Sequence, residues 1–268
     1  MIHKQHRMGV VAAALLASSA SAAVTQSLGA PADRRGQRDE PEASKPAPVD
    51  LGALFRMHYD TRVRSFREQN LAYKNVVLLG DSITEGFEVT TYFPGRRVLN
   101  RGIGGDVIGN ALPADDPRGV LRRLDCSVFD CAATDVFVMI GINDLNSGRD
   151  VDQMEEGYRE ILRRIKDRAP ALRVHVQSLL PTRGEFAARN EPIREFNRRL
   201  GRLAEEFGTH FLNLHPLFTD ADGQLKPDYT EDGLHLTEAG YRAWQAEVGR
   251  VMGWDTGLAQ APEIRPQP

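Results

Sequence analysis

Four short segments of the sequence carry side chains that could do chemistry together. "GDS" places Ser82 directly after the apolar run "NVVLL", and "GINDL" places Asn143 after a second apolar run. "DGLH" sets Asp232 three positions before His235, and "NRGIGGD" places glycines around Gly105. A serine hydroxyl attacks when a histidine takes its proton, and a carboxylate can fix the tautomer of that histidine. Glycine N–H groups and an asparagine amide can bind the oxyanion that such an attack creates.

Each of these segments also has a simpler interpretation when it is taken alone. Ser82 stands where a helix could begin, and serine is a favoured residue at a helix N-cap. The glycines begin like the G-x-G-x-x-G loop of dinucleotide-binding proteins, but Val107 stands where the third glycine belongs. Asn143 could be an ordinary turn residue, and His235 an exposed loop residue. The combination, in which three of the four segments follow expected strands, favours the chemical interpretation.

The elements that must position these residues follow from alternating sequence patterns. Runs rich in leucine or β-branched residues predict five strands, at residues 75–80, 96–100, 135–141, 172–180 and 209–214. Apolar residues at helical spacing predict four helices, at residues 119–124, 151–169, 191–208 and 236–252. Strand–helix alternation predicts a parallel sheet covered on both faces, with the site at the carboxyl ends of the strands.

Taken together, the four segments resemble the sequence blocks of the SGNH hydrolases, also called the GDSL esterase/lipase family. The resemblance covers residues 74–250. Within the family, "GIGGD" is similar to the second block of bacterial esterases that resemble platelet-activating-factor acetylhydrolase catalytic subunits. The resemblance implies a flavodoxin-like, three-layer α/β/α fold with a five-stranded parallel sheet.

The resemblance also implies a role for each candidate residue. Ser82 would be the nucleophile, His235 the general base and then general acid, and Asp232 the group that orients His235. The oxyanion hole would comprise the N–H groups of Ser82 and Gly105 and the side-chain amide of Asn143, with the glycine before Gly105 as the alternative donor.

The function that the resemblance implies is hydrolysis of carboxylic esters through an acyl-enzyme, without a metal or a cofactor. Ile83 stands where the family name has leucine, which is a conservative change. We expect a small-molecule or glycan ester as substrate, with a short acyl or acetyl group. Two alternatives stay open: an O-acyltransferase that acts on glycans, and a non-catalytic glycan-binding module on the same scaffold.

The ends of the 268-residue chain differ in composition from its middle. Lys4 and Arg7 precede a short apolar run that ends in "ASA" at 20–22, a pattern typical of a cleavable signal peptide. We expect a signal peptide (1–22), a disordered linker (23–50), the hydrolase domain (51–254) and a Pro-rich tail (255–268). The protein is therefore expected to be periplasmic or secreted.

Composition also narrows the possible partners. The formal net charge is −3 and becomes more negative if the basic leader is removed, which argues against nucleic acid as the main partner. No other apolar stretch is long enough to cross a bilayer. Cys126 and Cys131 could form a disulfide in an oxidising compartment or could stay free. Zinc is not expected, because no second cysteine or histidine pair stands at ligand spacing.

Overall fold

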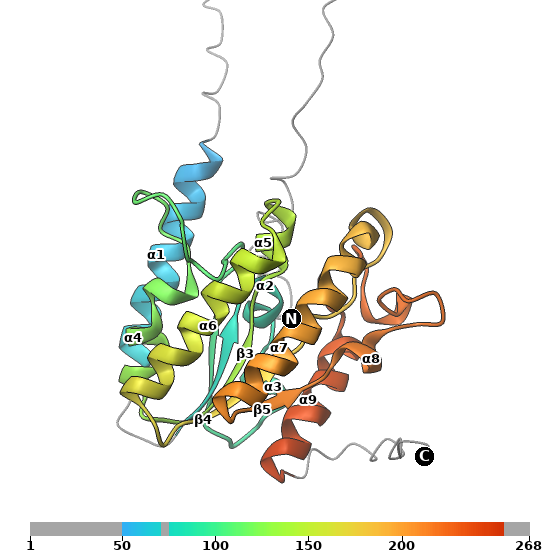
Figure 1. Ribbon diagram of the computed structural model, residues 1–268. Coiled ribbons are helices and arrows are strands. Elements are labelled where there is room, and N and C mark those ends of the chain that lie inside the picture. Colours follow the sequence, from blue (N-terminus) through green and yellow to red (C-terminus); the bar gives the residue numbers. More distant parts are fainter. Residues whose placement is uncertain (1–49, 71–74, 255–268) are drawn as a thin grey trace, which may run out of the picture. The chain divides into compact units, whose positions relative to one another are not determined.

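The computed structural model describes residues 50–70 and 75–254 (Figure 1). The expected signal peptide (1–22) and tail (255–268) lie outside the described residues, as does the expected linker (23–50) apart from Asp50. The chain separates into two compact units, one that ends at Arg56 and one that begins at Met57. The second unit contains the sheet and every candidate site residue.

A five-stranded parallel sheet forms the middle layer of the second unit and confirms the predicted fold class. Its strands are β1 (Asn75–Gly80), β2 (Val98–Gly102), β3 (Ala133–Met139), β4 (Arg173–Gln177) and β5 (His210–Leu212). Their order is β2-β1-β3-β4-β5, and all four neighbouring pairs are parallel. The chain therefore reverses its direction of travel across the sheet at the β1–β3 boundary, which is where open α/β folds bind ligands.

Helices connect the strands and cover the sheet. In the described residues they are α1 (Leu51–Gln69), α2 (Ser82–Glu85), α3 (Val89–Tyr92), α4 (Leu124–Ser127), α5 (Ile142–Asn146), α6 (Val151–Arg168), α7 (Asn190–Phe207), α8 (His215–Phe218) and α9 (Glu238–Met252). Short 3₁₀ turns lie at Val120–Arg122, Phe129–Cys131, Gly184–Arg189 and Pro227–Tyr229.

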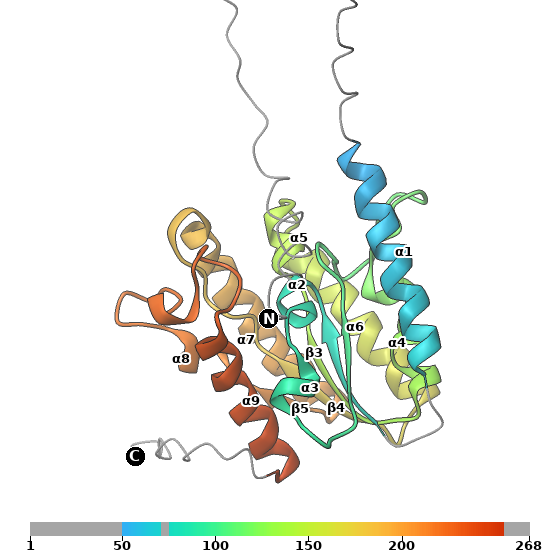
Figure 2. The ribbon, with the colours of Figure 1, turned by 180° about the vertical axis from the view of Figure 1, so that it is seen from behind.

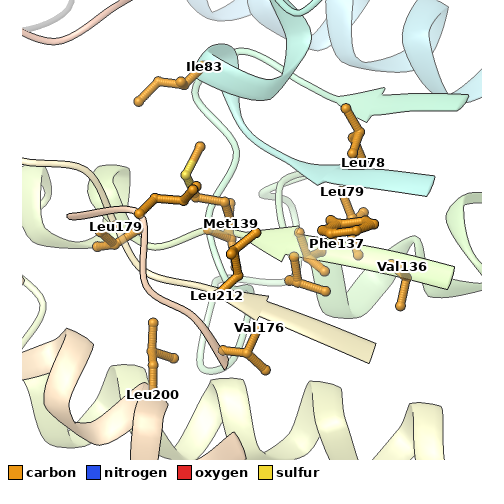
Figure 3. Packing of buried hydrophobic residues seen from close by; sticks show 14 of the residues in the cluster. Leu78, Leu79, Ile83, Val136, Phe137, Met139, Val176, Leu179, Leu200 and Leu212 are labelled. Atoms are coloured by element: carbon orange, nitrogen blue, oxygen red, sulfur yellow. The ribbon is translucent and has the colours of Figure 1, made fainter. Parts of the chain in front are cut away.

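The sheet is covered on both faces, by α6 and α7 on one side and α9 on the other (Figures 1 and 2). Helix α7 packs against β4, and the side chain of Val176 of β4 lies on the side of the sheet where Leu200 of α7 is seen (Figure 3). The next residue, Gln177, accepts a hydrogen bond from Trp244 Nε1 of α9 at 2.7 Å. Because successive strand residues point to opposite faces, the two helices must lie on opposite sides. Burial on both faces explains why β1 is apolar along most of its length and buried throughout.

The structure departs most from the predicted elements at three places. The bounds of the other predicted strands and helices differ by at most two residues, and the short helices α2, α3, α5 and α8 were not predicted. The strand expected over 172–180 ends at Gln177, because the side chain of Asn197 pairs with both backbone groups of Leu179 and replaces a strand partner. The helix expected over 119–124 is a 3₁₀ turn followed by the short helix α4. Helix α1 was not among the predicted elements, although Tyr59 and Phe66, both buried, are spaced as on one helix face.

Two further expectations concern membranes and cysteines. Across the described ranges, no helix combines the length and apolar character needed to span a bilayer. Cys126 and Cys131 are both buried, and both are free thiols in this structure.

Candidate active site

Ser82 is the first residue of α2 and lies where β1 ends. The Asp81 side chain caps this short helix by accepting the Ile83 N–H at 3.0 Å. The turn before it is so tight that a Cβ on Gly80 would lie 2.2 Å from Thr84 Oγ1 of α2, and 2.3 Å from the Met139 carbonyl oxygen of the neighbouring strand β3. Glycine and the capping aspartate therefore let the chain pass directly from strand to helix, which leaves Ser82 half-buried at the sheet edge.

His235 and Asp232 come from the loop before α9, 153 and 150 positions along the chain from Ser82. Nε2 of His235 lies 2.9 Å from the Ser82 hydroxyl oxygen, and Nδ1 lies 2.6 Å from Asp232 Oδ2. The carboxylate can only accept, so Nδ1 donates to it. In the neutral ring Nε2 is then unprotonated and can accept a hydrogen bond from the Ser82 hydroxyl. The structure thus brings the predicted nucleophile, base and orienting carboxylate into one hydrogen-bonded chain.

The electrostatics of the Asp232–His235 pair favour a charged carboxylate and a more basic ring. Burial opposes the charge on Asp232, but hydrogen bonds from the His235 side chain and from the N–H groups of Leu234 and His235 outweigh it and hold the pKa of Asp232 well below its usual range. Burial also opposes the imidazolium form of His235. The hydrogen bond and charge of Asp232, with the charge of Asp81, nevertheless raise the pKa of His235.

Two of the predicted oxyanion donors, Gly105 and Asn143, meet at a turn that follows β2. The Asp106 N–H donates to the Ile103 carbonyl at 3.1 Å, and Gly105, at the third position, has a φ of +73°. That φ is the signature of a type II turn and favours glycine. Asn143 Nδ2 donates one hydrogen to the Asp106 carbonyl at 2.9 Å, so its second amide hydrogen is left for a ligand.

The two glycines of this turn differ in what their N–H groups do. The Gly104 N–H donates to Glu85 Oε2 at 2.5 Å and is therefore occupied. The Gly105 N–H has no acceptor among residues 50–70 and 75–254. This difference favours Gly105 over Gly104 as a donor to a bound ligand.

A buried ion pair that the sequence did not reveal fixes the last residue of the turn at 103–106. Asp106 and Arg123 are both nearly inaccessible, and their closest contact is 2.7 Å. Asp106 also accepts the Gly119 N–H at 2.6 Å. Arg123 donates to the carbonyls of Gly80 and Arg101, each at 2.9 Å, and so joins the ends of β1 and β2. The sequence signal was one arginine in the run "GVLRRL", which helical periodicity does not distinguish from a surface residue.

Asp144, the neighbour of Asn143, holds the same loop from the other side. It is buried and accepts the Ile108 N–H at 3.0 Å, and Arg149 donates to it at 3.1 Å. Burial raises the pKa of Asp144 to about 6 despite these contacts. Its contacts are with the protein's own loops, as expected of a residue that supports the fold.

Two further buried or partly buried histidines contact residues outside the triad. His175 Nε2 contacts Asp135 Oδ1 at 2.9 Å, and His215 Nδ1 contacts Thr219 Oγ1 at 3.2 Å. Burial lowers the pKa of both histidines. In the part of the chain that the structure describes, no three histidine, cysteine, aspartate or glutamate residues are grouped as metal ligands.

Replacement of Asp81 by asparagine is expected to stabilise the fold at alkaline pH. Burial raises the pKa of Asp81 to about 7, whereas the unfolded value is about 4. Between these values the unfolded chain releases the proton and the folded chain keeps it, so stability falls as the pH rises from about 4 to 7. An asparagine oxygen can still accept the Ile83 N–H and carries no charge.

Urea unfolding at pH 8 and pH 4 tests this prediction. Asp81→Asn should raise the free energy of unfolding at pH 8 by about 1–4 kcal/mol, and the gain should vanish near pH 4. An equal change at both pH values would contradict the buried-charge explanation.

Comparison with known proteins agrees with the geometry of the site. The model of the GDSL-like lipase/acylhydrolase family matches residues 78–243, which include all five predicted site residues. The platelet-activating factor acetylhydrolase IB subunit alpha1 of Bos taurus is 31% identical over 248 residues, which cover 86% of this chain and 99% of that protein. The human protein of the same name is 30% identical with the same coverage.

Solved structures show the same fold. A Streptococcus pneumonia protein described as a platelet activating factor superimposes with a TM-score of 0.67 at 26% identity, covering 75% of this chain and 96% of that chain. A GDSL-like lipase from Bacteroides thetaiotaomicron gives a TM-score of 0.62 at 22% identity, covering 73% and 97%, and supports the fold alone. Because the family model spans more than half of the chain and its blocks converge at one sheet edge, this protein belongs to the GDSL-like lipase/acylhydrolase family, the SGNH hydrolases that its sequence resembles.

Proposed function

We propose that the protein is a serine esterase in which Ser82, His235 and Asp232 form a catalytic triad. The observation that carries this proposal is the continuous chain of contacts from the Ser82 hydroxyl through both ring nitrogens of His235 to Asp232, at 2.9 and 2.6 Å. A hydroxyl whose proton has a nearby acceptor, in a family of acylhydrolases, supports nucleophilic attack on an ester.

The proposed reaction has two halves. The Ser82 oxygen attacks the ester carbonyl while His235 Nε2 takes the hydroxyl proton, and Asp232 stabilises the imidazolium. The carbonyl oxygen becomes an oxyanion that the N–H groups of Ser82 and Gly105 and the free amide hydrogen of Asn143 would bind. His235 then protonates the leaving alcohol, and the acyl group stays on Ser82. Water that His235 deprotonates attacks this acyl-enzyme, releases the carboxylic acid and restores the Ser82 hydroxyl.

The proposed substrates are esters of short acyl groups, and acetyl esters are proposed to be the preferred ones. The bovine and human relatives are named for acetyl hydrolysis, and at about 30% identity along nearly their whole length they support an acetyl-sized acyl group here. The alcohol half of the substrate is proposed to be a small molecule or a glycan.

Hydrolysis of p-nitrophenyl acetate, butyrate and octanoate tests the proposed esterase. We expect kcat/KM to be highest for acetate. Ser82→Ala should lower the rate by about 10⁴- to 10⁶-fold, because nothing else in the site can form the acyl-enzyme. Ser147→Ala, a serine exposed at the end of α5, is the matched control and should retain the parent rate.

Three other outcomes would overturn this proposal. Equal rates in the parent and Ser82→Ala would remove the serine mechanism. Transfer of the acyl group to an added sugar instead of water would favour an O-acyltransferase. Glycan binding without any turnover would favour a binding module.

The pH dependence of kcat/KM tests the role of His235. General base catalysis needs the neutral ring, so the rate should fall as the pH drops through the pKa of His235, which lies above the usual value of about 6.5. Asp232→Asn removes the partner that raises this pKa, so the midpoint should move to lower pH while kcat falls by about 10⁴-fold. A midpoint that does not move would show that another group controls the profile.

We also propose that the protein is exported, on the basis of the basic residues and apolar run of segment 1–22. When the full chain is expressed in a bacterium, N-terminal sequencing of the periplasmic or secreted protein should find Ala23 first. A protein that stays in the cytoplasm with residues 1–22 attached would contradict export.

A further inference from the structure

Glu85 carries a carboxylate and lies beside the active site, but the proposed reaction gives this carboxylate no role. It is the last residue of α2, one helical turn after Ser82. Its Oε2 accepts the Gly104 N–H at 2.5 Å, and its side chain is only 24% exposed. Gly104 directly precedes Gly105, so Glu85 holds the turn that carries the proposed oxyanion donor.

Two basic residues of α1 hold Glu85 in place. His58 Nε2 lies 3.1 Å from Glu85 Oε1, and Arg62 Nε lies 3.4 Å from the same oxygen. Arg62 also donates to the carbonyl of Gly102 at 2.8 Å, directly before the turn. His58 and Arg62 are four residues apart and so share one face of the helix. Both belong to the compact unit that begins at Met57.

These neighbours keep Glu85 ionised. Burial opposes its charge, but the hydrogen bond from His58 and the charge of Arg62 outweigh this effect and lower the pKa of Glu85. A carboxylate is a stronger acceptor for a backbone N–H than a neutral group is. Glu85 is therefore suited to hold a peptide unit in one orientation.

The turn needs such an anchor because of its composition. Two adjacent glycines have more backbone freedom than any other pair, and the direction of the Gly105 N–H depends on the φ and ψ angles of both. On the carboxyl side, Asp106 is fixed by Arg123 and Asn143. On the amino side, the anchor that the structure shows for the Gly104 N–H is Glu85.

We propose that Glu85 is a positioning residue that fixes the Gly104–Gly105 turn and thereby aims the Gly105 N–H at the oxyanion. This inference rests on the proposed function, because it assigns Glu85 a part in the same reaction. Glu85 acts through the turn and does not touch the substrate. His58 and Arg62 act one step further back, by fixing the Glu85 side chain.

Kinetics of Glu85→Ala and Glu85→Gln test this role, with Glu88→Ala as the matched control. Glu88 lies three residues further along the chain and makes no side-chain contact with the turn. Glu85→Ala should lower kcat by about 10- to 100-fold with little change in KM, because a misplaced donor weakens binding of the transition state. Glu85→Gln should lose less, since an amide oxygen can still accept the Gly104 N–H. Glu88→Ala should match the parent.

Hydrogen exchange of the Gly104 amide, followed by NMR, provides a readout that does not need activity. The amide should be protected in the parent and in Glu88→Ala, less protected in Glu85→Gln, and exchange fastest in Glu85→Ala. A folded Glu85→Ala variant with an exchanging amide and the parent kcat would overturn the positioning role. A Gly104 amide that stays protected in Glu85→Ala would also overturn it. So would a loss of kcat in Glu88→Ala as large as the loss in Glu85→Ala.

Failure of the proposed function looks different from failure of this inference. If the parent shows no Ser82-dependent hydrolysis, the esterase proposal fails, and Glu85 loses its part in catalysis even if exchange confirms its contact with Gly104. If hydrolysis depends on Ser82 but not on Glu85, the esterase stands and only the positioning role is lost.

Discussion

The buried ion pair between Asp106 and Arg123 is the interaction on which the site depends. Charges are costly to bury unless each is paired and hydrogen-bonded, and this pair meets both conditions. Arg123 also donates to the Ser127 hydroxyl and to the carbonyls of Gly80 and Arg101 near the ends of β1 and β2, so one guanidinium fixes two strand ends and the donor turn together. Phe66 of α1 lies beneath Arg123, with the guanidinium carbon 5.8 Å from the ring centre. Removal of one partner from a buried pair of this kind costs about 3–5 kcal/mol, because the other charge is left uncompensated.

The rest of the site is assembled across the point where the strand order reverses. Ser82 follows β1 and Asn143 follows β3, so parallel pairing alone places both at one edge of the sheet. The His235 loop is remote in sequence, so a separate contact must hold it near Ser82. The Tyr241 hydroxyl of α9 donates to the Ile83 carbonyl of α2 at 2.9 Å. This hydrogen bond joins the helix that follows the His235 loop to the helix that begins with Ser82.

Several buried carboxylates surround the site. Their burial lowers the stability of the fold, and one of them also affects the protonation of His235. Burial raises the pKa of Asp81, Asp106 and Asp144, and these three acids lie close enough to influence one another. The negative charge of Asp81 also favours the imidazolium form of His235. A loss of folding stability from buried ionisable groups is common where a fold holds a polar site in one geometry.

The resemblance to the SGNH hydrolases implied the three-layer architecture and the roles of the five site residues. Residue types and periodicity by themselves predicted the parallel sheet and the placement of Ser82 and Asn143 at one of its edges. Both depend on local rules: apolar runs become buried strands, and residues that follow parallel strands share an edge. Helix α1, Arg123 and Glu85 were decided by tertiary structure. Their contacts join positions such as 62 and 102, or 85 and 104, and nothing in local spacing distinguishes a buried arginine or glutamate from a solvated one. The sequence therefore determined which groups could react, and packing of distant segments decided what holds them in place.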